Sequence, residues 1–182
     1  AEHIVNSIPP ETGIIFAPDR NLGAYLSKKL KREMVLWNGS CMVHEIFSLD
    51  KIKNLKEKHP NAKMIAHPEC EAPILELADF IGSTTGLLKY TQTDEAQEYI
   101  VATETGILHQ MMKASPDKTF IPAPPNNSCA CNDCPHMKLN SLEKLYLCME
   151  YETPEINMEE ELRLAAKRPI DRMLEISKAA GL

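Results

Sequence analysis

Three cysteines lie close together in the C-terminal third of the chain. Cys129, Cys131 and Cys134 form a C-x-C-x-x-C pattern, and thiolates at such short spacing are typical ligands of zinc or of an iron–sulfur cluster. The pattern lacks the second C-x-x-C pair of a zinc ribbon, and His136 is too close in sequence to be a comfortable fourth zinc ligand. An iron–sulfur cluster that also uses a cysteine from a distant turn therefore fits the pattern better.

Two other cysteines, Cys41 and Cys70, are the candidates for that distant ligand. A cluster with a missing protein ligand leaves one iron open, where it can act as a Lewis acid on a substrate oxygen. Cys148 differs from these, because it lies on an apolar face of a predicted helix. We expect it to be a buried, inert thiol.

His67 and Glu69 place an imidazole and a carboxylate on one turn, next to Cys70. Residues two apart in an extended segment share a face, so the pair could exchange protons or ligate an open metal position. The tetrapeptide could equally be an ordinary surface turn. His44 follows Cys41 by three residues and is a further candidate for contact with the metal site or the substrate.

Residues 82–86 read Gly-Ser-Thr-Thr-Gly and precede a predicted helix. Ser83 and Thr84 offer hydroxyl groups, and the helix start offers backbone N–H groups, to a phosphate or carboxylate. The run is not a Walker A loop, because no lysine stands beside Thr84 or Thr85. Small polar residues also simply begin helices, so this signal is weak by itself.

The elements that must position these residues alternate between strand-like and helix-like segments. The predicted strands are residues 13–18, 34–37, 63–66, 80–81, 98–102 and 119–122, and the predicted helices between them are 21–31, 48–58, 71–78, 84–90 and 107–113. Such alternation predicts an α/β protein with parallel sheets covered by helices on both faces, a three-layer αβα arrangement.

Five of the predicted strands end in a short polar signature. These signatures begin at Pro18, Asn38, His67, Gly82 and Thr103. Ligands of parallel sheets bind outside the carboxyl ends of the strands, so we expect the signatures to face a shared cleft. Ordinary turns need the same residue types, although five such turns in a short chain favour a functional role.

The last part of the sequence predicts two helices, at residues 141–150 and 157–179. Ser141 resembles a helix N-cap, since its hydroxyl can accept a backbone N–H of the first turn. Pro169 lies inside the second helix, where it removes a hydrogen bond and predicts a kink or a break.

Composition restricts the class of protein. The chain has 182 residues, 43% of them hydrophobic, and a net charge of −6, which supports a folded core and argues against a nucleic-acid-binding surface. No apolar run approaches the ~18 residues of a membrane helix. The first six residues show no secretory signal, so we expect a cytoplasmic protein with no membrane partner.

Six segments together resemble the quinolinate synthase family, and they follow one another in the order seen in that family. The matching segments are residues 16–23, 37–45, 67–70, 78–84, 103–108 and 134–140. They extend over nearly the whole chain, and their common order makes the resemblance strong although each segment alone is weak.

The resemblance implies a fold of three similar α/β domains around a pseudo-threefold axis, of which this chain holds about two. Residues 1–45 would be the second part of the middle domain, residues 46–126 the third domain, and residues 127–182 the cysteine loop and closing helices. The family's 4Fe-4S cluster is held by three cysteines, one from each domain. By motif position two of them are Cys41 and Cys134, whereas Cys70 matches no ligand position and the third cysteine lies in the N-terminal region that this chain lacks.

The resemblance also implies a reaction, in which iminoaspartate and dihydroxyacetone phosphate condense to quinolinate with loss of phosphate and water, in NAD biosynthesis. Glu69, His67 and His44 would be the catalytic groups, and Ser83 and Thr84 would bind a substrate carboxylate or phosphate together with His67 and Glu69. A functional link to an aspartate-oxidising enzyme is implied as well. We expect the isolated chain to be inactive without the missing N-terminal region.

Two other interpretations remain open at the level of the sequence. In the first, Cys129, Cys131, Cys134 and His136 hold zinc in a hydrolase. In the second, the cysteines brace a loop of a binding module and the polar turns have no chemical role. Three turn residues near the expected cleft, Asp19, Asn21 and Glu104, are interpreted as turn-forming.

Overall fold

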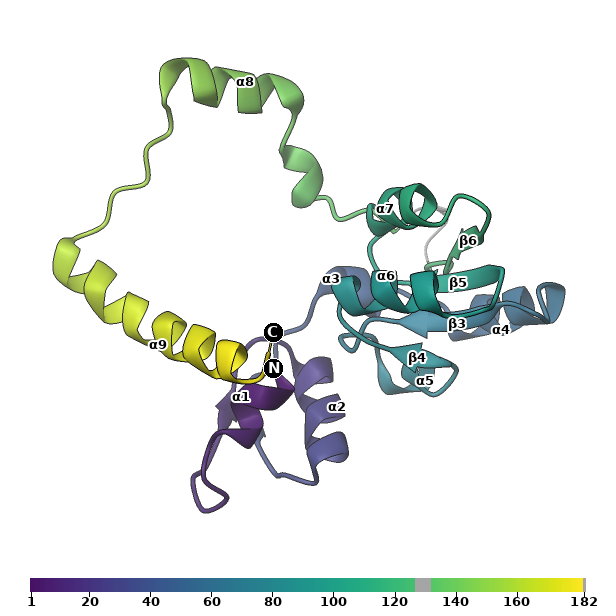
Figure 1. Cartoon of the computed structure of the whole chain (residues 1–182), viewed down its shortest axis with the longest axis horizontal. Coiled ribbons are helices and arrows are strands. Elements are labelled where there is room, and N and C mark those ends of the chain that lie inside the picture. Colours follow the sequence, from purple (N-terminus) through teal and green to yellow (C-terminus); the bar gives the residue numbers. More distant parts are fainter. Residues whose placement is uncertain (127–131, 182) are drawn as a thin grey trace. The chain divides into compact units, whose positions relative to one another are not determined.

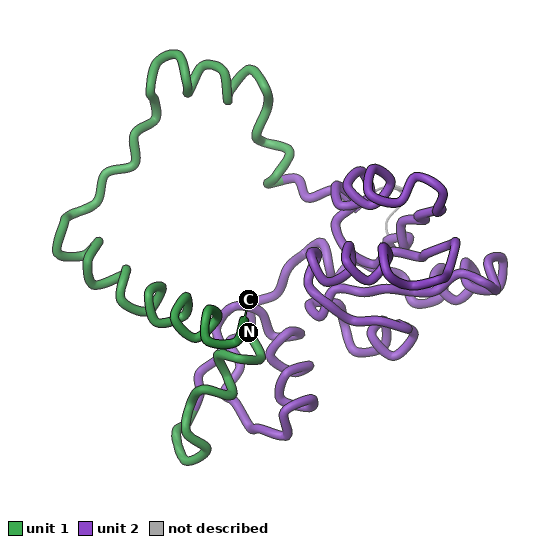
Figure 2. Tube along the Cα trace, viewed as in Figure 1, with its two compact units in different colours: residues 1–13, 136–182 green, residues 14–135 purple. Residues whose placement is uncertain are grey.

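The computed structural model describes residues 1–126 and 132–181 of the chain. The chain divides into two compact units, one of residues 14–135 and the other of residues 1–13 with 136–182 (Figure 2). Parallel sheets flanked by helices make up the larger unit, which confirms the predicted α/β class. The division into family domains at residues 45 and 126 stays a prediction, because the two units reflect contacts within this chain alone.

The larger sheet of this unit has four parallel strands in the order β4-β3-β5-β6 (Figure 1). The strands are β3 (Lys63–Ala66), β4 (Phe80–Ile81), β5 (Glu98–Ala102) and β6 (Thr119–Pro122). Ala66 pairs with Ile81 of β4 and with Ala102 of β5. The turns that begin at His67, Gly82 and Thr103 therefore leave the same edge of the sheet, as the sequence predicts.

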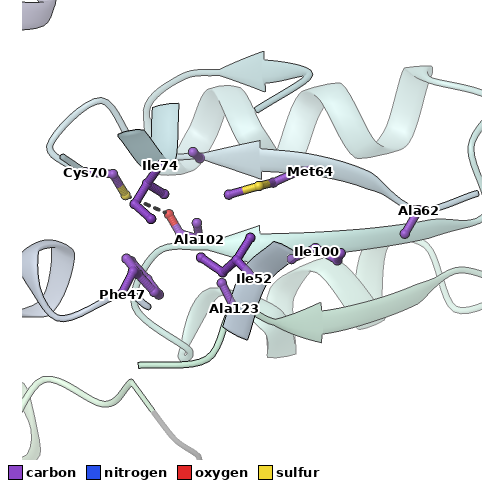
Figure 3. Close-up of a cluster of buried hydrophobic side chains, with 10 residues drawn as sticks. Phe47, Ile52, Ala62, Met64, Cys70, Ile74, Ile100, Ala102 and Ala123 are labelled. Atoms are coloured by element: carbon purple, nitrogen blue, oxygen red, sulfur yellow. Dashed lines mark hydrogen bonds between the residues drawn. The ribbon is translucent and has the colours of Figure 1, made fainter. Parts of the chain in front are cut away.

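Helices cover both faces of this sheet, and the helices are α4 (Leu49–Lys58), α5 (Ala72–Leu75), α6 (Thr84–Thr93) and α7 (Ile107–Ala114). Alternate residues of a strand face opposite sides. Met64 and Ile100 accordingly lie in one apolar cluster with Ile52 of α4, which Figure 3 shows. Ile65 and Val101 belong to a second cluster with side chains of α6 and α7. The predicted three-layer arrangement is thus present here.

The smaller sheet pairs two short parallel strands, β1 (Ile15–Phe16) and β2 (Val35–Leu36). Helix α2 (Arg20–Leu30) covers one face, where the backbone of Gly23 lies against Phe16 and Leu36. The short helix α3 (Met42–Glu45) follows β2. The other face exposes three apolar side chains, Ile15 at 78%, Val35 at 67% and Trp37 at 58%.

The second unit contains helix α1 (Glu2–Asn6), a 3-10 turn (Met137–Leu139), helix α8 (Leu142–Tyr151) and helix α9 (Glu160–Ala179). Ser141 caps α8 by accepting the backbone N–H of Lys144, which confirms the predicted N-cap. Helices α1 and α9 contact one another. None of the described helices is long and apolar enough to cross a membrane.

Helix α9 continues through Pro169, so the helix is not broken there and the predicted kink stays a prediction. A proline removes one hydrogen bond, and the remaining bonds of a 20-residue helix can hold the helix together. One prediction for this unit is wrong, because Cys148 is exposed rather than buried. The apolar face of α8 to which it belongs is itself exposed, with Leu142 at 86% and Met149 at 74%.

Candidate metal and substrate site

Cys41 lies at the centre of the candidate site, in the loop between β2 and α3. It occupies the N-cap position of α3, with an extended backbone, and its side chain is partly exposed. One ligand atom each from Cys41, His44 and Glu69 lies within 4.8 Å of the others. A thiol, an imidazole and a carboxylate from two separate turns thus converge on one point, as a metal site requires.

His44 connects three parts of the site. Its Nε2 atom is hydrogen-bonded to the Thr103 hydroxyl at 3.0 Å, and its Nδ1 atom lies 3.1 Å from Oε2 of Glu69. Its ring stacks on that of His67, with centroids 4.5 Å apart and planes inclined by 14°. The buried His44 is therefore held in one orientation between the turns that follow β3 and β5.

The two groups of the His-Pro-Glu turn lie together, as the sequence predicts, with His67 Nδ1 3.8 Å from Glu69 Oε2. The neighbouring His44 imidazole holds the pKa of Glu69 below its usual range. Burial, and then the neighbouring His44, lowers the pKa of His67. At neutral pH the site consequently presents an anionic carboxylate beside an imidazole that favours its neutral form.

Cys70 is in the same turn but belongs to the core. Its side chain is 0% exposed, and its thiol donates to the carbonyl oxygen of Ala102 at 3.4 Å (Figure 3). Burial raises the pKa of this thiol far above its ordinary value. A metal ligand must be a thiolate, and the burial of Cys70 disfavours that form; the choice of Cys41 over Cys70 as a ligand stays a prediction.

Cys134 is half-buried. The two residues before it are hydrogen-bonded to other parts of the larger unit. The side-chain amide of Asn132 donates to the carbonyl oxygen of Val43 in α3 at 2.8 Å. Thr105 is hydrogen-bonded to the Asp133 carboxylate, and the backbone N–H of Cys134 donates to Glu104. Cys129 and Cys131, which the zinc interpretation needs, lie outside the described residues.

Ser83 and Thr84 lie where α6 begins, at the sheet edge that also carries His67. The Ser83 hydroxyl accepts the backbone N–H of Gly86 at 3.2 Å and so caps the helix. Thr84 is exposed in the first turn. A helix start of this kind can bind a substrate anion, and the structure leaves both the structural and the binding role available to Ser83.

Two residues shape the site although the sequence assigned neither of them a role of its own: Thr103, which begins one of the predicted polar signatures, and Asn132. Both are buried polar residues that hydrogen-bond to α3 or to His44. Their partners are more than fifty positions away in sequence, so no local pattern identifies them. A polar residue directly after an apolar strand, such as Thr103 after β5, was the available signal.

The comparisons with known proteins agree with one another. Residues 1–175 match the family model described as quinolinate synthetase A protein. The chain is 60% identical over 179 residues to the quinolinate synthase of Chloroherpeton thalassium, covering 98% of this chain and 56% of the relative. It is 62% identical over 177 residues to the quinolinate synthase of Nostoc punctiforme, covering 97% of this chain and 55% of that relative. It is 61% identical over 177 residues to the quinolinate synthase of Microcystis aeruginosa, covering 97% of this chain and 56% of that relative. The chain therefore spans little more than half the length of the curated relatives that it matches.

Proposed function

Since the chain belongs to the quinolinate synthetase A protein family, we propose that it supplies the part of a quinolinate synthase that carries two of three cluster cysteines. The observation that carries the proposal is the convergence of Cys41, His44 and Glu69 within 4.8 Å. The remainder of the enzyme, with the third cysteine, would come from the part of the relatives' length that this chain does not span, which the family resemblance implies is N-terminal.

Cys41 and Cys134 are the proposed ligands of a 4Fe-4S cluster. The residues present fit such a group, because the partly exposed thiol of Cys41 lies within 4.8 Å of a carboxylate oxygen of Glu69 and a ring nitrogen of His44. The competing thiol of Cys70 is withdrawn into the core. When bound, a cluster with one iron not held by cysteine supplies a Lewis acid for the loss of water from a substrate.

The proposed reaction condenses iminoaspartate with dihydroxyacetone phosphate to quinolinate, phosphate and water. Glu69, held anionic beside His44, would accept a proton at Oε2 from a substrate carbon or oxygen. His67, which favours its neutral form, would accept or return a proton at its ring nitrogen. His44 would orient both groups through its contacts to Glu69 and its stacking on His67.

Substrate anions would be bound at the start of α6. The backbone N–H groups of its first turn and the hydroxyls of Ser83 and Thr84 would hold a carboxylate or the phosphate.

An imine such as iminoaspartate hydrolyses readily in water, so an aspartate-oxidising enzyme is the proposed supplier of this substrate. The cytoplasm, where thiols stay reduced, is the proposed location.

Product formation tests the proposal. The chain would be combined with the N-terminal region of the Chloroherpeton thalassium relative, reconstituted anaerobically with iron and sulfide, and assayed for quinolinate by mass spectrometry. We expect quinolinate to form, and Glu69→Gln to lower the rate by ~10²–10⁴-fold, the contribution typical of one acid–base group. Glu71→Gln, which alters an exposed carboxylate two residues away, should leave the rate unchanged. A fully active Glu69→Gln protein, or no quinolinate from the unaltered protein, would contradict the proposal.

A further inference from the structure

Asp19 makes two hydrogen bonds that tie Cys41 to the start of α2. Its Oδ1 atom accepts the backbone N–H of Leu22 at 2.8 Å, which caps the helix. Its Oδ2 atom accepts the backbone N–H of Cys41 at 2.8 Å. The carboxylate is 3% exposed, so both bonds are shielded from water and are correspondingly strong.

Glu104 makes the corresponding pair of bonds to Cys134. Its Oε2 atom accepts the backbone N–H of Gly106 at 2.7 Å, within the turn that begins α7. Its Oε1 atom accepts the backbone N–H of Cys134 at 3.4 Å. One oxygen thus stabilises the turn that carries the acid, and the other holds a cysteine from a distant loop, as in the case of Asp19.

The two acids occupy equivalent places in the fold. Asp19 follows β1 and Glu104 follows β5, each just beyond the carboxyl end of a parallel strand. The carboxylate of each acid accepts the backbone N–H of one of the two proposed cluster ligands. We infer that Asp19 and Glu104 are positioning residues that tether Cys41 and Cys134 for the cluster and keep negative charge beside it. This inference rests on the proposed function.

The first consequence concerns retention of the cluster. A cysteine whose backbone is fixed loses less conformational entropy when its thiolate binds iron than a cysteine on a free loop. Groups that orient metal ligands typically contribute 10–100-fold to metal affinity. Loss of either tether should therefore weaken the cluster without removing a ligand.

The second consequence concerns the reduction potential. Hydrogen bonds to the sulfurs and the net charge around a cluster set its potential. In this arrangement the N–H groups of Cys41 and Cys134 donate to carboxylates, and the two carboxylates add negative charge nearby. Both effects would disfavour a reduced cluster, and so they would favour the oxidised state, in which an open iron would be the stronger Lewis acid.

The neutral amide cannot replace either acid. Both oxygens of each carboxylate accept a backbone N–H, whereas Asn or Gln has one acceptor oxygen and an amide group that only donates. Asp19→Asn and Glu104→Gln must each lose one of the two bonds while they preserve the shape of the side chain. Asp79→Asn is a matched control, because Asp79 accepts the backbone N–H of Met64 at 2.7 Å and, among the cysteines that the structure describes, its side chain is hydrogen-bonded to none.

Gly106 provides a second way to disturb Glu104. A Cβ atom at this position would lie 2.7 Å from Oε2 of Glu104, so Gly106→Ala must displace the carboxylate. The backbone of Gly106 is right-handed helical, a conformation open to alanine. Gly106→Ala should therefore reproduce the effect of Glu104→Gln on Cys134 while the charge is retained.

The tethers are tested first in the metal-free chain by amide hydrogen exchange. With ¹⁵N-cysteine labelling, we expect Asp19→Asn to accelerate exchange of the Cys41 amide by tenfold or more and to leave Cys134 unchanged. Glu104→Gln and Gly106→Ala should accelerate exchange of the Cys134 amide and leave the Cys41 amide unchanged. Asp79→Asn should alter the exchange of neither amide. Unchanged exchange in Asp19→Asn and in Glu104→Gln would overturn the tethers themselves.

The effect on the cluster is tested in the protein reconstituted with the N-terminal region. Asp19→Asn and Glu104→Gln should release iron to a chelator about tenfold faster or more and should shift the midpoint potential upward; Asp79→Asn should match the unaltered protein. Iron release and potential that stay unchanged in both variants would overturn the inference. If the unaltered protein binds no iron, the proposed function fails and the role at the cluster fails with it, whereas the amide exchange still decides whether the tethers exist.

Discussion

Single residues of one type take different roles in this chain because their surroundings differ. Among the cysteines that the structure describes, Cys41 and Cys134 are partly exposed, Cys70 is buried and Cys148 is exposed. Burial raises the pKa of Cys70, and its thiol donates to a backbone oxygen. Exposure and hydrogen bonding, rather than sequence spacing, thus separate the candidate ligands from the core thiol.

Alkylation of the folded, metal-free chain checks this difference. We expect iodoacetamide to modify Cys148 readily and Cys70 at least about a hundredfold more slowly, because the buried Cys70 is held as an unreactive thiol. Peptide mapping by mass spectrometry gives the rate at each cysteine, and denaturation in urea should make the two rates similar. Equal rates in the folded chain would contradict the burial of Cys70.

The sequence was most informative where chemistry is local. His67 and Glu69 are two residues apart, and their side chains lie together as predicted, although in a turn closed by the Cys70 N–H to the His67 carbonyl and not along an extended segment. The contact of His44 with Thr103 joins segments 59 positions apart, so only the folded chain reveals it. The burial predicted for Cys148 is wrong because an apolar helical face indicates only that a partner surface is needed, not that the chain supplies one.

At the scale of elements, hydrophobic runs and turn residues located nearly every helix and strand of the larger sheet. Helix α5 is an exception, since it covers Ala72–Leu75 instead of residues 71–78. Asp79 explains part of the difference, because its backbone N–H donates to Met64 and its carboxylate accepts the Met64 N–H. These long-range bonds draw the chain out of the helix and into β4, and helix propensity alone cannot predict them.

Two helical glycines provide a matched pair for testing how α2 packs. A Cβ atom at Gly23 would lie 2.6 Å from Leu36 and 2.9 Å from Phe16, whereas at Gly86 its nearest neighbour is the Ser83 hydroxyl at 3.4 Å. We expect Gly23→Ala to lower the free energy of unfolding by about 1–3 kcal/mol through overpacking. Gly86→Ala should be neutral or stabilising by up to ~1 kcal/mol, since alanine favours helix.

Urea denaturation followed by circular dichroism measures both changes. If Gly23→Ala proves as stable as the unaltered chain, α2 does not pack on β1 and β2 as described. The comparison with Gly86→Ala removes the contribution of helix propensity, which is similar for the two sites.

Asp94 joins α6 to two strands of the larger sheet. Its carboxylate pairs with Lys63 of β3 and accepts the Tyr99 hydroxyl of β5 at 2.8 Å and the backbone N–H of Ala96 at 3.0 Å. The bond from Lys63 holds the pKa of Asp94 well below its usual range. The folded state therefore binds fewer protons than the unfolded state at acid pH. The resulting stability is present above about pH 4 and is lost as the pH falls further.

We expect Asp94→Ala to lower the free energy of unfolding by about 2 kcal/mol at pH 7, because it removes the acceptor of the buried Tyr99 hydroxyl and of the partly buried Ala96 N–H. The difference in the free energy of unfolding between the variant and the unaltered chain should shrink as the pH falls below about 4, where the carboxylate of the unfolded chain begins to be protonated. Urea titrations at several pH values measure how this difference depends on pH. A cost that does not depend on pH would show that the charge of Asp94 contributes nothing.

At the scale of the whole molecule, the smaller sheet has a covered and an uncovered face. Parallel sheets are generally buried on both faces, yet Ile15, Val35 and Trp37 are exposed. The chain also spans little more than half the length of its relatives. Trp37 is the single tryptophan of the sequence, so its fluorescence reports on this face alone.

We expect addition of the N-terminal region of a relative, itself with any tryptophan replaced by phenylalanine, to move the Trp37 emission to shorter wavelength. Trp37→Phe should abolish the signal, which confirms its source. An emission spectrum that does not change, although the two parts bind each other, would show that the added region leaves this face of the smaller sheet exposed.

Iron binding tests the central claim most directly. The chain and the N-terminal region would be reconstituted anaerobically with iron and sulfide, and iron content, visible absorbance and EPR would be measured for Cys41→Ser, Cys134→Ser, Cys70→Ser and the unaltered protein. We predict about four irons per protein, lost with Cys41→Ser or Cys134→Ser and kept with Cys70→Ser. Tight binding of zinc in place of iron, or a cluster that survives without Cys41 and Cys134, would contradict the account.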